Sequence, residues 1–363
     1  MSKSSVYSVI LAGGRGERFW PLSTAERPKQ FLRLISDKMM LEETIDRVVP
    51  IIPKDNVRIV TSDDMSELIV KNIKGLKEAN ILGEPQGRNT CLAIALAAAH
   101  LQRSDPNAVM VVLSADHLIR PPERLCELIS TGVEIASTEN KLITLGIVPT
   151  RPETAYGYIK LGEVFKSVES TSVYEVSEFT EKPKAAVAHE YFFSGAYLWN
   201  SGMFIWSAAS ILKAIEGCQP AMHSLLQEYG AKIGTKGEIK ARKELYDKAL
   251  SISIDVAVLE NARNVLTIKA DIVWDDIGSW NSLDRYKEHD SDNNVIIGPA
   301  LTTQSYEITA YNDTDGLIAC LGVSDLVVVR TENVTLVVHK TQTGNIKTLL
   351  SQIEQNEKFR KFL

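Results

Sequence analysis

The sequence predicts an α/β protein with a mixed, mainly parallel sheet flanked by helices, followed by a small all-β segment. Short apolar runs alternate with amphipathic stretches over most of the chain, and several of these runs end in loops rich in glycine or aspartate. From Val295 onward the pattern changes to short apolar runs separated by Asn and Gly. Strands that alternate with helices imply right-handed crossovers and parallel pairing. Ligands of such sheets bind at the carboxyl ends of the strands.

Apolar runs and their periodicity place the individual elements. The run 108–113 is the clearest buried strand because all six of its residues are apolar, and the small alanines of 91–101 let a helix lie close to a sheet. The expected strands are 9–11, 57–61, 81–82, 108–113, 142–148, 176–179, 197–206 and 265–270, and the expected helices are 41–49, 65–76, 91–101 and the segment 208–250. The later strands are expected at 295–298, 317–320, 326–329 and 334–338, before a closing helix at 346–362.

The length of 363 residues suggests about two or three domains. The polar stretch 290–294 marks a boundary between a first domain, 1–289, and a β-rich domain with a closing helix, 290–363. The formal net charge of −6 argues against a nucleic-acid-binding surface.

The cysteine pattern and the hydropathy indicate a cytoplasmic protein. The four cysteines are far apart and form no Cys-x-x-Cys pair, so we expect reduced thiols. The first apolar run breaks at Gly13-Gly14, so no signal peptide is expected. No stretch approaches the roughly 18–20 apolar residues that cross a bilayer.

The loop after the first strand combines glycines with cations. Glycines let a backbone pass close to a ligand and expose its N–H groups, and fixed cations nearby suit a polyphosphate. A dinucleotide fingerprint is disfavoured because Phe19 stands where a glycine is needed, and no Walker A sequence follows. A tight turn without a ligand is the alternative. The residues concerned are Gly13, Gly14, Gly16, Arg15, Arg18 and Lys29.

This loop resembles the signature of the sugar-1-phosphate nucleotidylyltransferases. The shared residues are Leu11-Ala12-Gly13-Gly14-x-Gly16-x-Arg18, Pro21-Leu22-Ser23 and Pro28-Lys29-Gln30. The Pro-Lys-Gln-Phe ending is closest to the mannose-1-phosphate guanylyltransferases, and the resemblance recurs over nearly the whole chain. It implies that the nucleotide is bound by Leu11, Ala12, Gly13, Gly14, Arg15, Gly16, Arg18, Lys29, Gln86, Gly87, Asn89 and Asp116. Of these, Gln86, Gly87 and Asn89 would face the base, although a polar loop that caps the next helix is the simpler interpretation of 84–90.

Two aspartates are candidate magnesium ligands. Asp116 follows the strand 108–113, and Mg²⁺ prefers oxygen ligands such as one or two carboxylates with phosphate oxygens. The stretch Trp274–Trp280 resembles the family's Trp-x-Asp-x-Gly-Ser-Trp motif and places Asp276 at the second ligand position. Asp275 is the alternative ligand, and each aspartate could instead cap a turn. His117 is predicted either to pack against the site or to support the metal ligands from outside, because Mg²⁺ disfavours imidazole.

Three further motifs resemble the sugar-phosphate site of the family. Thr180-Glu181-Lys182-Pro183 matches the Glu-Lys-Pro motif, in which Val usually precedes the glutamate. The resemblance assigns Glu181 to the hexose hydroxyls and Lys182 to the 1-phosphate, and a solvated ion pair is the alternative. Asn200 in Trp-Asn-Ser-Gly would bind sugar hydroxyls, and the Tyr156-Gly157 backbone would contact the sugar.

The resemblance implies a Rossmann-like enzyme that makes GDP-mannose and pyrophosphate from GTP and α-D-mannose 1-phosphate with Mg²⁺. The catalytic residues would be Arg18, Lys29, Asp116, Lys182 and Asp276. Another nucleotide or sugar 1-phosphate, a non-catalytic subunit that senses nucleotide sugars and an NAD-dependent dehydrogenase are the alternatives. The β-rich domain looks like the family's short β-helix-like appendage, which implies a homodimer. Some members continue into a phosphomannose isomerase domain; the sequence ends before it, so isomerase activity is not expected.

Overall fold

The computed structural model describes residues 5–168 and 170–363. Contacts divide the chain into two compact units. Unit 1 comprises the residues up to Gly13 together with 44–115 and 119–274, and unit 2 comprises 14–43, 116–118 and 275–363. The predicted boundary between residues 289 and 290 stays a prediction. Within the described ranges, no helix combines the length and apolarity needed to cross a bilayer.

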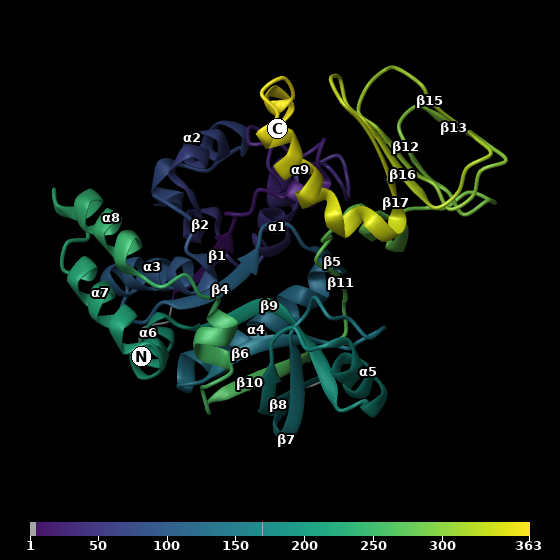
Figure 1. Cartoon of the computed structure of the whole chain (residues 1–363). Coiled ribbons are helices and arrows are strands. Elements are labelled where there is room, and N and C mark those ends of the chain that lie inside the picture. The colour runs from purple at the N-terminus through teal and green to yellow at the C-terminus, as the bar shows by residue number, and fades with distance from the viewer. Residues whose placement is uncertain (1–4, 169) are drawn as a thin grey trace. The chain divides into compact units, whose positions relative to one another are not determined.

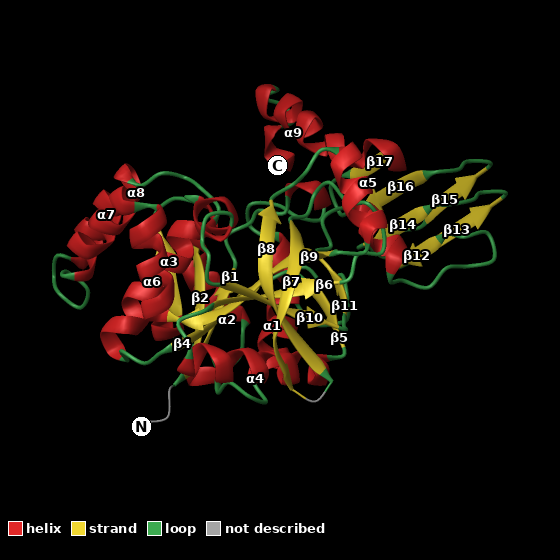
Figure 2. Cartoon of the chain, turned by 90° about the horizontal axis from the view of Figure 1, so that it is seen from below, coloured by secondary structure: helices red, strands yellow, loops and turns green. Residues whose placement is uncertain are grey.

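Unit 1 is built on one large mixed sheet (Figure 2). Its strand order is β3-β2-β1-β4-β9-β6-β10-β8-β7, with an additional pairing of β7 to β9. Parallel pairing joins β1 to β2 and β4, β2 to β3, and β6 to β10, whereas β8 and β9 run in the opposite direction to their neighbours. The bounds are β1 (Val6–Leu11), β2 (Val57–Ser62), β3 (Ile81–Glu84), β4 (Val109–Ser114), β6 (Leu142–Ile147), β7 (Tyr158–Val168), β8 (Thr171–Thr180), β9 (Tyr197–Ser207) and β10 (Val265–Ala270). The predicted mixed, mainly parallel sheet is therefore confirmed.

Helices cover both faces of this sheet because successive strand residues point to opposite sides. Phe204 and Trp206 of β9 join the apolar cluster that contains α3 (Asn89–Ser104) and α6 (Ala208–Cys218). Ile205, between them, contacts α4 (Pro122–Thr138) on the other face, where a Cβ at Gly132 would lie only 2.4 Å from the Ile205 Cδ1 atom. A glycine at position 132 thus lets α4 approach the sheet closely.

The predicted helices are all present, with shifted ends. The helices are α1 (Met40–Val48), α2 (Asp63–Asn72), α3 (Asn89–Ser104), α4 (Pro122–Thr138), α5 (Ala185–Ser194), α6 (Ala208–Cys218), α7 (Pro220–Gly230), α8 (Glu238–Lys248) and α9 (Ile346–Gln355). The segment 208–250 is helical as predicted and consists of three helices, because Pro220 begins a new helix and 231–237 forms turns. The sequence analysis did not identify α4 or α5. None of the four cysteines forms a disulfide.

Unit 2 contains the predicted all-β segment, built as a short parallel stack (Figure 1). Strands β12, β14 and β16 pair in parallel, β13 pairs with β15 in parallel, and β17 closes the first sheet antiparallel to β16. Successive chain turns thus lie on one another, as in a short β-helix, around a core of Ile308, Ala310, Ile318 and Val328. The bounds are β12 (Val295–Ile297), β13 (Ala300–Thr303), β14 (Thr309–Asn312), β15 (Ile318–Leu321), β16 (Leu326–Arg330) and β17 (Thr335–His339). A separate two-stranded sheet is formed by β5 (Leu118–Arg120) and β11 (Val273–Asp275).

An aromatic core joins the N-terminal loop of unit 2 to its C-terminal part. The Trp280 indole packs on Phe19 at 5.1 Å between ring centroids and donates a hydrogen bond of 3.2 Å to the Trp20 main-chain oxygen. The Trp20 indole donates to the main-chain oxygen of Phe362 at 2.9 Å. The closing helix α9 ends at Gln355, earlier than predicted, because its apolar periodicity stops at Ile353. This core holds the glycine-rich loop against the end of the chain.

Candidate functional site

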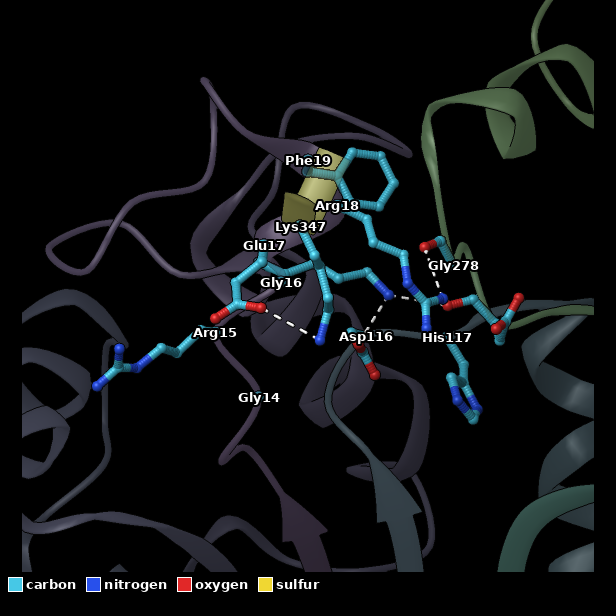
Figure 3. Close-up of a pocket in the computed structure, with 12 residues that line it drawn as sticks. Gly14, Arg15, Gly16, Glu17, Arg18, Phe19, Asp116, His117, Gly278 and Lys347 are labelled. Atoms are coloured by element: carbon cyan, nitrogen blue, oxygen red, sulfur yellow. Dashed lines mark hydrogen bonds and ion pairs between the residues drawn. The ribbon is translucent and has the colours of Figure 1, made fainter. Parts of the chain in front are cut away.

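Unit 2 contains a pocket of about 440 Å³ in which most of the predicted phosphate- and metal-binding residues meet (Figure 3). The pocket is lined by residues from the glycine-rich loop, from the turn after β4, from the turn after β11 and from α9. They are Gly14, Arg15, Gly16, Glu17, Arg18, Phe19, Lys29, Asp116, His117, Asp276, Gly278 and Lys347. Long-range folding therefore gathers four distant segments around one cavity.

Lys29 is the fixed cation of this pocket. Lys29 is 6% exposed, and its ammonium donates to the Asp116 Oδ2 atom at 2.7 Å and to the Asp276 main-chain oxygen at 2.8 Å. The ammonium also lies 5.7 Å from the centre of the Phe19 ring. One buried amine thus connects the two segments that carry the predicted metal ligands. A buried ammonium with defined acceptors is a positioned charge.

Gly16 has a definite steric role in placing Lys29. Its φ of 70° is left-handed, and a Cβ at this position would lie 2.3 Å from the Lys29 Cβ atom. Glycine is therefore required both for the backbone conformation and for the close approach. A Cβ at Gly14 would meet nothing within 4 Å, so the chain there borders open space.

The Asp116 carboxylate remains ionised beside Lys29. Burial alone would raise the pKa of Asp116, but the charges of Lys29 and His117 outweigh burial, so its pKa lies below the usual carboxyl value. Its side chain is about one-third exposed, at 33%. The Asp116 carboxylate thus presents a charged oxygen at the pocket wall that could bind a metal ion.

The contacts of Asp275 distinguish it from Asp276. Both carboxylate oxygens of Asp275 accept from Arg285, at 2.5 and 2.7 Å, and Oδ1 also accepts from the Ile277 amide at 2.8 Å. Asp275 is 6% exposed and does not line the pocket, whereas Asp276 does. This arrangement supports Asp276 over Asp275 as the metal-binding candidate.

The arginines of the loop differ in direction. Arg18 donates to the Gly278 main-chain oxygen at 3.2 Å and so spans the pocket rim. Figure 3 shows Arg15 extending away from Asp116 and His117. Arg18 is therefore the better placed of the two for a ligand beside Asp116.

The predicted sugar-binding residues gather in unit 1, where strands β7, β8 and β9 meet. Tyr158 at the start of β7 pairs with Thr180 at the end of β8 and with Trp199 in β9. This register brings together the residues that flank those three: Gly157, Glu181 and Asn200. The main-chain N–H of Asn200 donates to the Gly157 main-chain oxygen at 2.8 Å.

Glu181 presents a buried carboxylate oxygen without a partner. Its Oε1 atom accepts from the Lys182 ammonium at 2.6 Å, but Oε2 is buried and makes no hydrogen bond. A Cβ at Gly157 would lie 2.5 Å from Oε2, so only glycine leaves room for this carboxylate. An unpaired buried oxygen is costly unless a ligand supplies the donor. A sugar hydroxyl is such a donor.

Asn200 is oriented by two neighbours that the sequence analysis did not identify. Its side-chain oxygen accepts from the Thr144 hydroxyl at 3.0 Å, and its amide nitrogen donates to the Asp255 Oδ1 atom at 2.8 Å. Burial and the negative charge of Glu181 raise the pKa of Asp255 to about 6. The second amide hydrogen of Asn200 is left to serve a ligand.

The remaining sugar-site candidates differ in exposure. Lys182 has a left-handed φ of 47°, and its side chain is 63% exposed, so its ammonium can move to a phosphate. The Tyr156 ring packs edge-on against Trp199 and Trp274, with centroids 5.1 and 5.0 Å away. Only its backbone was predicted to contact the sugar, and the ring is part of the core.

The predicted base-binding loop is connected to α8. The Gln86 side chain donates to the Asp247 Oδ1 atom at 3.0 Å, and Asn89 begins α3 with a left-handed φ of 63°. A Cβ at Gly87 would meet nothing within 4 Å. In the adjacent strand end, the Ala12 amide donates to the Val60 main-chain oxygen at 2.8 Å, which fixes the exit from Leu11.

Glu84, just before this loop, is a buried acid that the sequence analysis did not identify. It accepts from the Tyr246 hydroxyl at 3.0 Å, and a Cβ at Gly13 would lie 3.6 Å from its Oε2 atom. Burial raises the pKa of Glu84 from 4.5 to about 7, although the Tyr246 hydrogen bond acts in the opposite direction. The folded protein therefore retains this proton over a pH range in which the unfolded chain has lost it.

This raised pKa predicts a pH-dependent stability. As pH rises from 5 to 8, the free energy of unfolding falls, because the folded state must give up a proton that it binds more tightly than the unfolded state does. Glu84→Gln keeps an acceptor for Tyr246 and removes the titration, so it should reduce this fall by on the order of 2 kcal/mol. Urea denaturation at both pH values measures it, with the exposed Glu78→Gln as control. An identical fall in Glu84→Gln and in the parent protein would contradict the assignment.

The structure thus assembles the predicted residues in two groups. Gly14, Arg15, Gly16, Arg18, Lys29, Asp116 and Asp276 line the pocket of unit 2, and Leu11, Ala12, Gly13, Gln86, Gly87, Asn89, Tyr156, Gly157, Glu181, Lys182 and Asn200 belong to unit 1. The sequence analysis missed Glu84, Asp255 and Lys347. Glu84 could have been found as an acidic residue at the end of a strand-like apolar run, and Asp255 as an acidic residue before a helix-like apolar run. No motif near Lys347 indicates a functional role for it.

Two family models match the chain. The model described as nucleotidyl transferase matches residues 7–293, and the model described as a mannose-phosphate isomerase/GMP-like β-helix domain matches residues 302–353. The second match corresponds to the parallel stack of unit 2.

Curated relatives and a solved structure agree with these models. The mannose-1-phosphate guanylyltransferase of Escherichia coli K12 is 34% identical over 98% of this chain and 74% of its own length, and that of Salmonella muenchen is 35% identical over 98% and 75%. A Thermus thermophilus structure described as a mannose-1-phosphate geranyltransferase has a TM-score of 0.86 at 34% identity, over 96% of this chain and 99% of that one. The chain belongs to the nucleotidyl transferase family and, within it, to the mannose-1-phosphate guanylyltransferases.

Proposed function

We propose that the protein joins GTP and α-D-mannose 1-phosphate into GDP-mannose and pyrophosphate. The observation that carries the proposal is the buried Lys29 ammonium, which holds the Asp116 carboxylate and the Asp276 main chain in one pocket with Arg18. We assign the triphosphate to this pocket and the hexose to the group around Glu181 and Asn200. The names of the curated relatives support the choice of mannose and guanine.

The reaction places few demands on acid–base chemistry. A phosphate oxygen of mannose 1-phosphate attacks the α-phosphorus of GTP. The bond between that phosphorus and the oxygen that bridges it to the β-phosphorus breaks, and this oxygen leaves as part of pyrophosphate. The nucleophile is already anionic near neutral pH, so no strong general base is needed. Catalysis then depends on positioning and on neutralising charge. Lys29 and Arg18 would stabilise the departing pyrophosphate, with Arg15 assisting from the loop.

The pocket suits Mg²⁺ by the chemistry of its donors. Asp116 and Asp276 supply hard carboxylate oxygens, and the described residues hold no cluster of three or more His, Cys, Asp or Glu side chains placed for a metal. Two carboxylates are a donor set that Mg²⁺ uses when substrate phosphates and water complete its coordination. When bound, the ion would neutralise phosphate charge and polarise the reacting phosphorus. His117 would remain outside the ligand set.

The hexose and its phosphate would be held by the unit 1 group. Glu181 Oε2 would accept from a sugar hydroxyl and so gain the partner that it lacks, and Asn200 would donate its second amide hydrogen. Lys182 would leave Glu181 for the 1-phosphate, which is a point-charge contact that a mobile lysine can make. The backbone at Gly157 would lie against the sugar, and Gln86, Gly87 and Asn89 would contact the base.

A pyrophosphate-release screen tests the proposal. The purified chain is incubated with Mg²⁺ and each pair drawn from GTP, ATP, UTP and dTTP with mannose, glucose or heptose 1-phosphate. We expect the highest kcat/KM for GTP with mannose 1-phosphate and no release in the presence of a chelator. A preference for another pair would reassign the substrates, and binding of GDP-mannose without turnover of any pair would favour a regulatory subunit. The homodimer and the cytoplasmic location stay predictions; sedimentation velocity tests the first.

A further inference from the structure

The last helix contributes a cation to the phosphate pocket. Lys347, near the start of α9, lines the same cavity as Arg18, Lys29 and Asp116. Figure 3 shows its side chain pointing into that cavity, with its ammonium paired to Glu17 of the glycine-rich loop at 3.2 Å. More than 300 residues separate these partners along the chain.

The Lys347–Glu17 pair is a weak one. The side chains are 62% and 41% exposed, and exposed ion pairs of this kind contribute about 0–1 kcal/mol. Such a pair can therefore be exchanged at little cost for a stronger, charge-assisted contact. Lys29 differs, because it is buried and held by two acceptors at 2.7 and 2.8 Å.

The charges of the pocket explain why such a cation is useful. Lys29 already balances Asp116, and Glu17 and Asp276 are two further carboxylates among the lining residues. A polyphosphate that enters the pocket adds several negative charges and would be repelled by Glu17 unless a cation lies beside it. Lys347 is placed to offset that repulsion and to donate to the ligand.

We propose that Lys347 is a pyrophosphate-binding residue. Its ammonium breaks the ion pair with Glu17 and then contacts the β- and γ-phosphates of the nucleotide and the departing pyrophosphate. The inference rests on the proposed function for the identity of the nucleotide. The chemistry that Lys347 recognises is that of an inorganic pyrophosphate group. The C-terminal helix is thereby part of the binding site and not only a packing element.

Two substitutions separate binding from packing, because both break the same ion pair. Lys347→Gln should raise the KM for pyrophosphate in the reverse reaction about tenfold, with the KM for GDP-mannose unchanged. Glu17→Gln should lower the KM for pyrophosphate about threefold, because Lys347 is then unpaired and one like charge is gone. The double variant should resemble Lys347→Gln. The exposed Lys358→Gln serves as the matched control and should behave as the parent protein.

A structural role would give a different pattern. If the ion pair only fixes α9 on the loop, Lys347→Gln and Glu17→Gln should change the KM values in the same direction, and that result would overturn the proposal. Circular dichroism and thermal unfolding check that each variant is folded. Titration of pyrophosphate alone into the parent chain and Lys347→Gln gives a measurement independent of turnover. Equal affinities of the two proteins for pyrophosphate would reject the role of Lys347. Absence of turnover in the parent protein would reject the proposed function instead.

Discussion

Asp116→Asn is expected to lower kcat about a thousandfold, which corresponds to about 4 kcal/mol of transition-state stabilisation. The amide keeps the size of the carboxylate and an acceptor for Lys29, so the fold should persist. It removes the negative charge that would hold Mg²⁺ beside the substrate phosphates. Pyrophosphate release at saturating substrates and increasing Mg²⁺ measures the effect.

Asp55→Asn is a suitable control for this change. Asp55 is 81% exposed at its side chain and pairs with the exposed Lys77, so its loss should leave kcat unchanged. The two variants should have similar thermal midpoints. If Asp116→Asn turned over near the parent rate at high Mg²⁺, Asp116 would have to be removed from the catalytic site.

Lys29→Gln should lower kcat/KM for GTP by a factor of about 100 to 1,000. The ammonium is the buried cation of the pocket, and its two acceptors would lose a charged donor. The pKa of Asp116 should rise toward its usual value because Lys29 is a main cause of its lowering. Steady-state kinetics with varied GTP measures the first effect, and Lys77→Gln, 71% exposed at its side chain, is the control.

The substrate dependence of the Lys29 variant is the informative part. If the only change were a higher KM for mannose 1-phosphate, the assignment of Lys29 to the nucleotide phosphates would be contradicted. Unchanged rates with GTP would remove it from the site. A moderate loss of stability is expected as well, since Asp116 would then be a partly buried carboxylate without its cation.

Local patterns were sufficient for the framework of the fold. The all-apolar run 108–113 matches β4 closely, because a parallel strand that is buried on both faces is apolar throughout. The predicted strand 197–206 also matches β9 closely. The sequence analysis missed α4 although Leu125, Leu128 and Ile129 have helical spacing, and it extended α9 beyond Gln355. The first error concerns a 17-residue helix whose apolar periodicity is visible in the sequence, and the second concerns a helix end, where tertiary contacts outweigh local preference.

The candidate site divides in the same way. The glycine-rich loop, Asp116, Asp276 and Glu181 could be found because each belongs to a motif of adjacent residues. The choice between Asp275 and Asp276 rested on motif register alone, whereas the structure distinguishes them through Arg285, which occupies both oxygens of Asp275. Arg285 lies beyond the motif, so only folding shows which acid it contacts.

By itself, the sequence determined the sheet, its loop of glycines and the residue types that are suited to a phosphate, because backbone conformation and apolar periodicity are local properties. Only the tertiary structure decided that Asp255 orients Asn200, that Gly157 makes room for Glu181, and that Lys347 lines the pocket of unit 2. These contacts join segments far apart in the chain. Their energies depend on distance and burial, which no local pattern encodes.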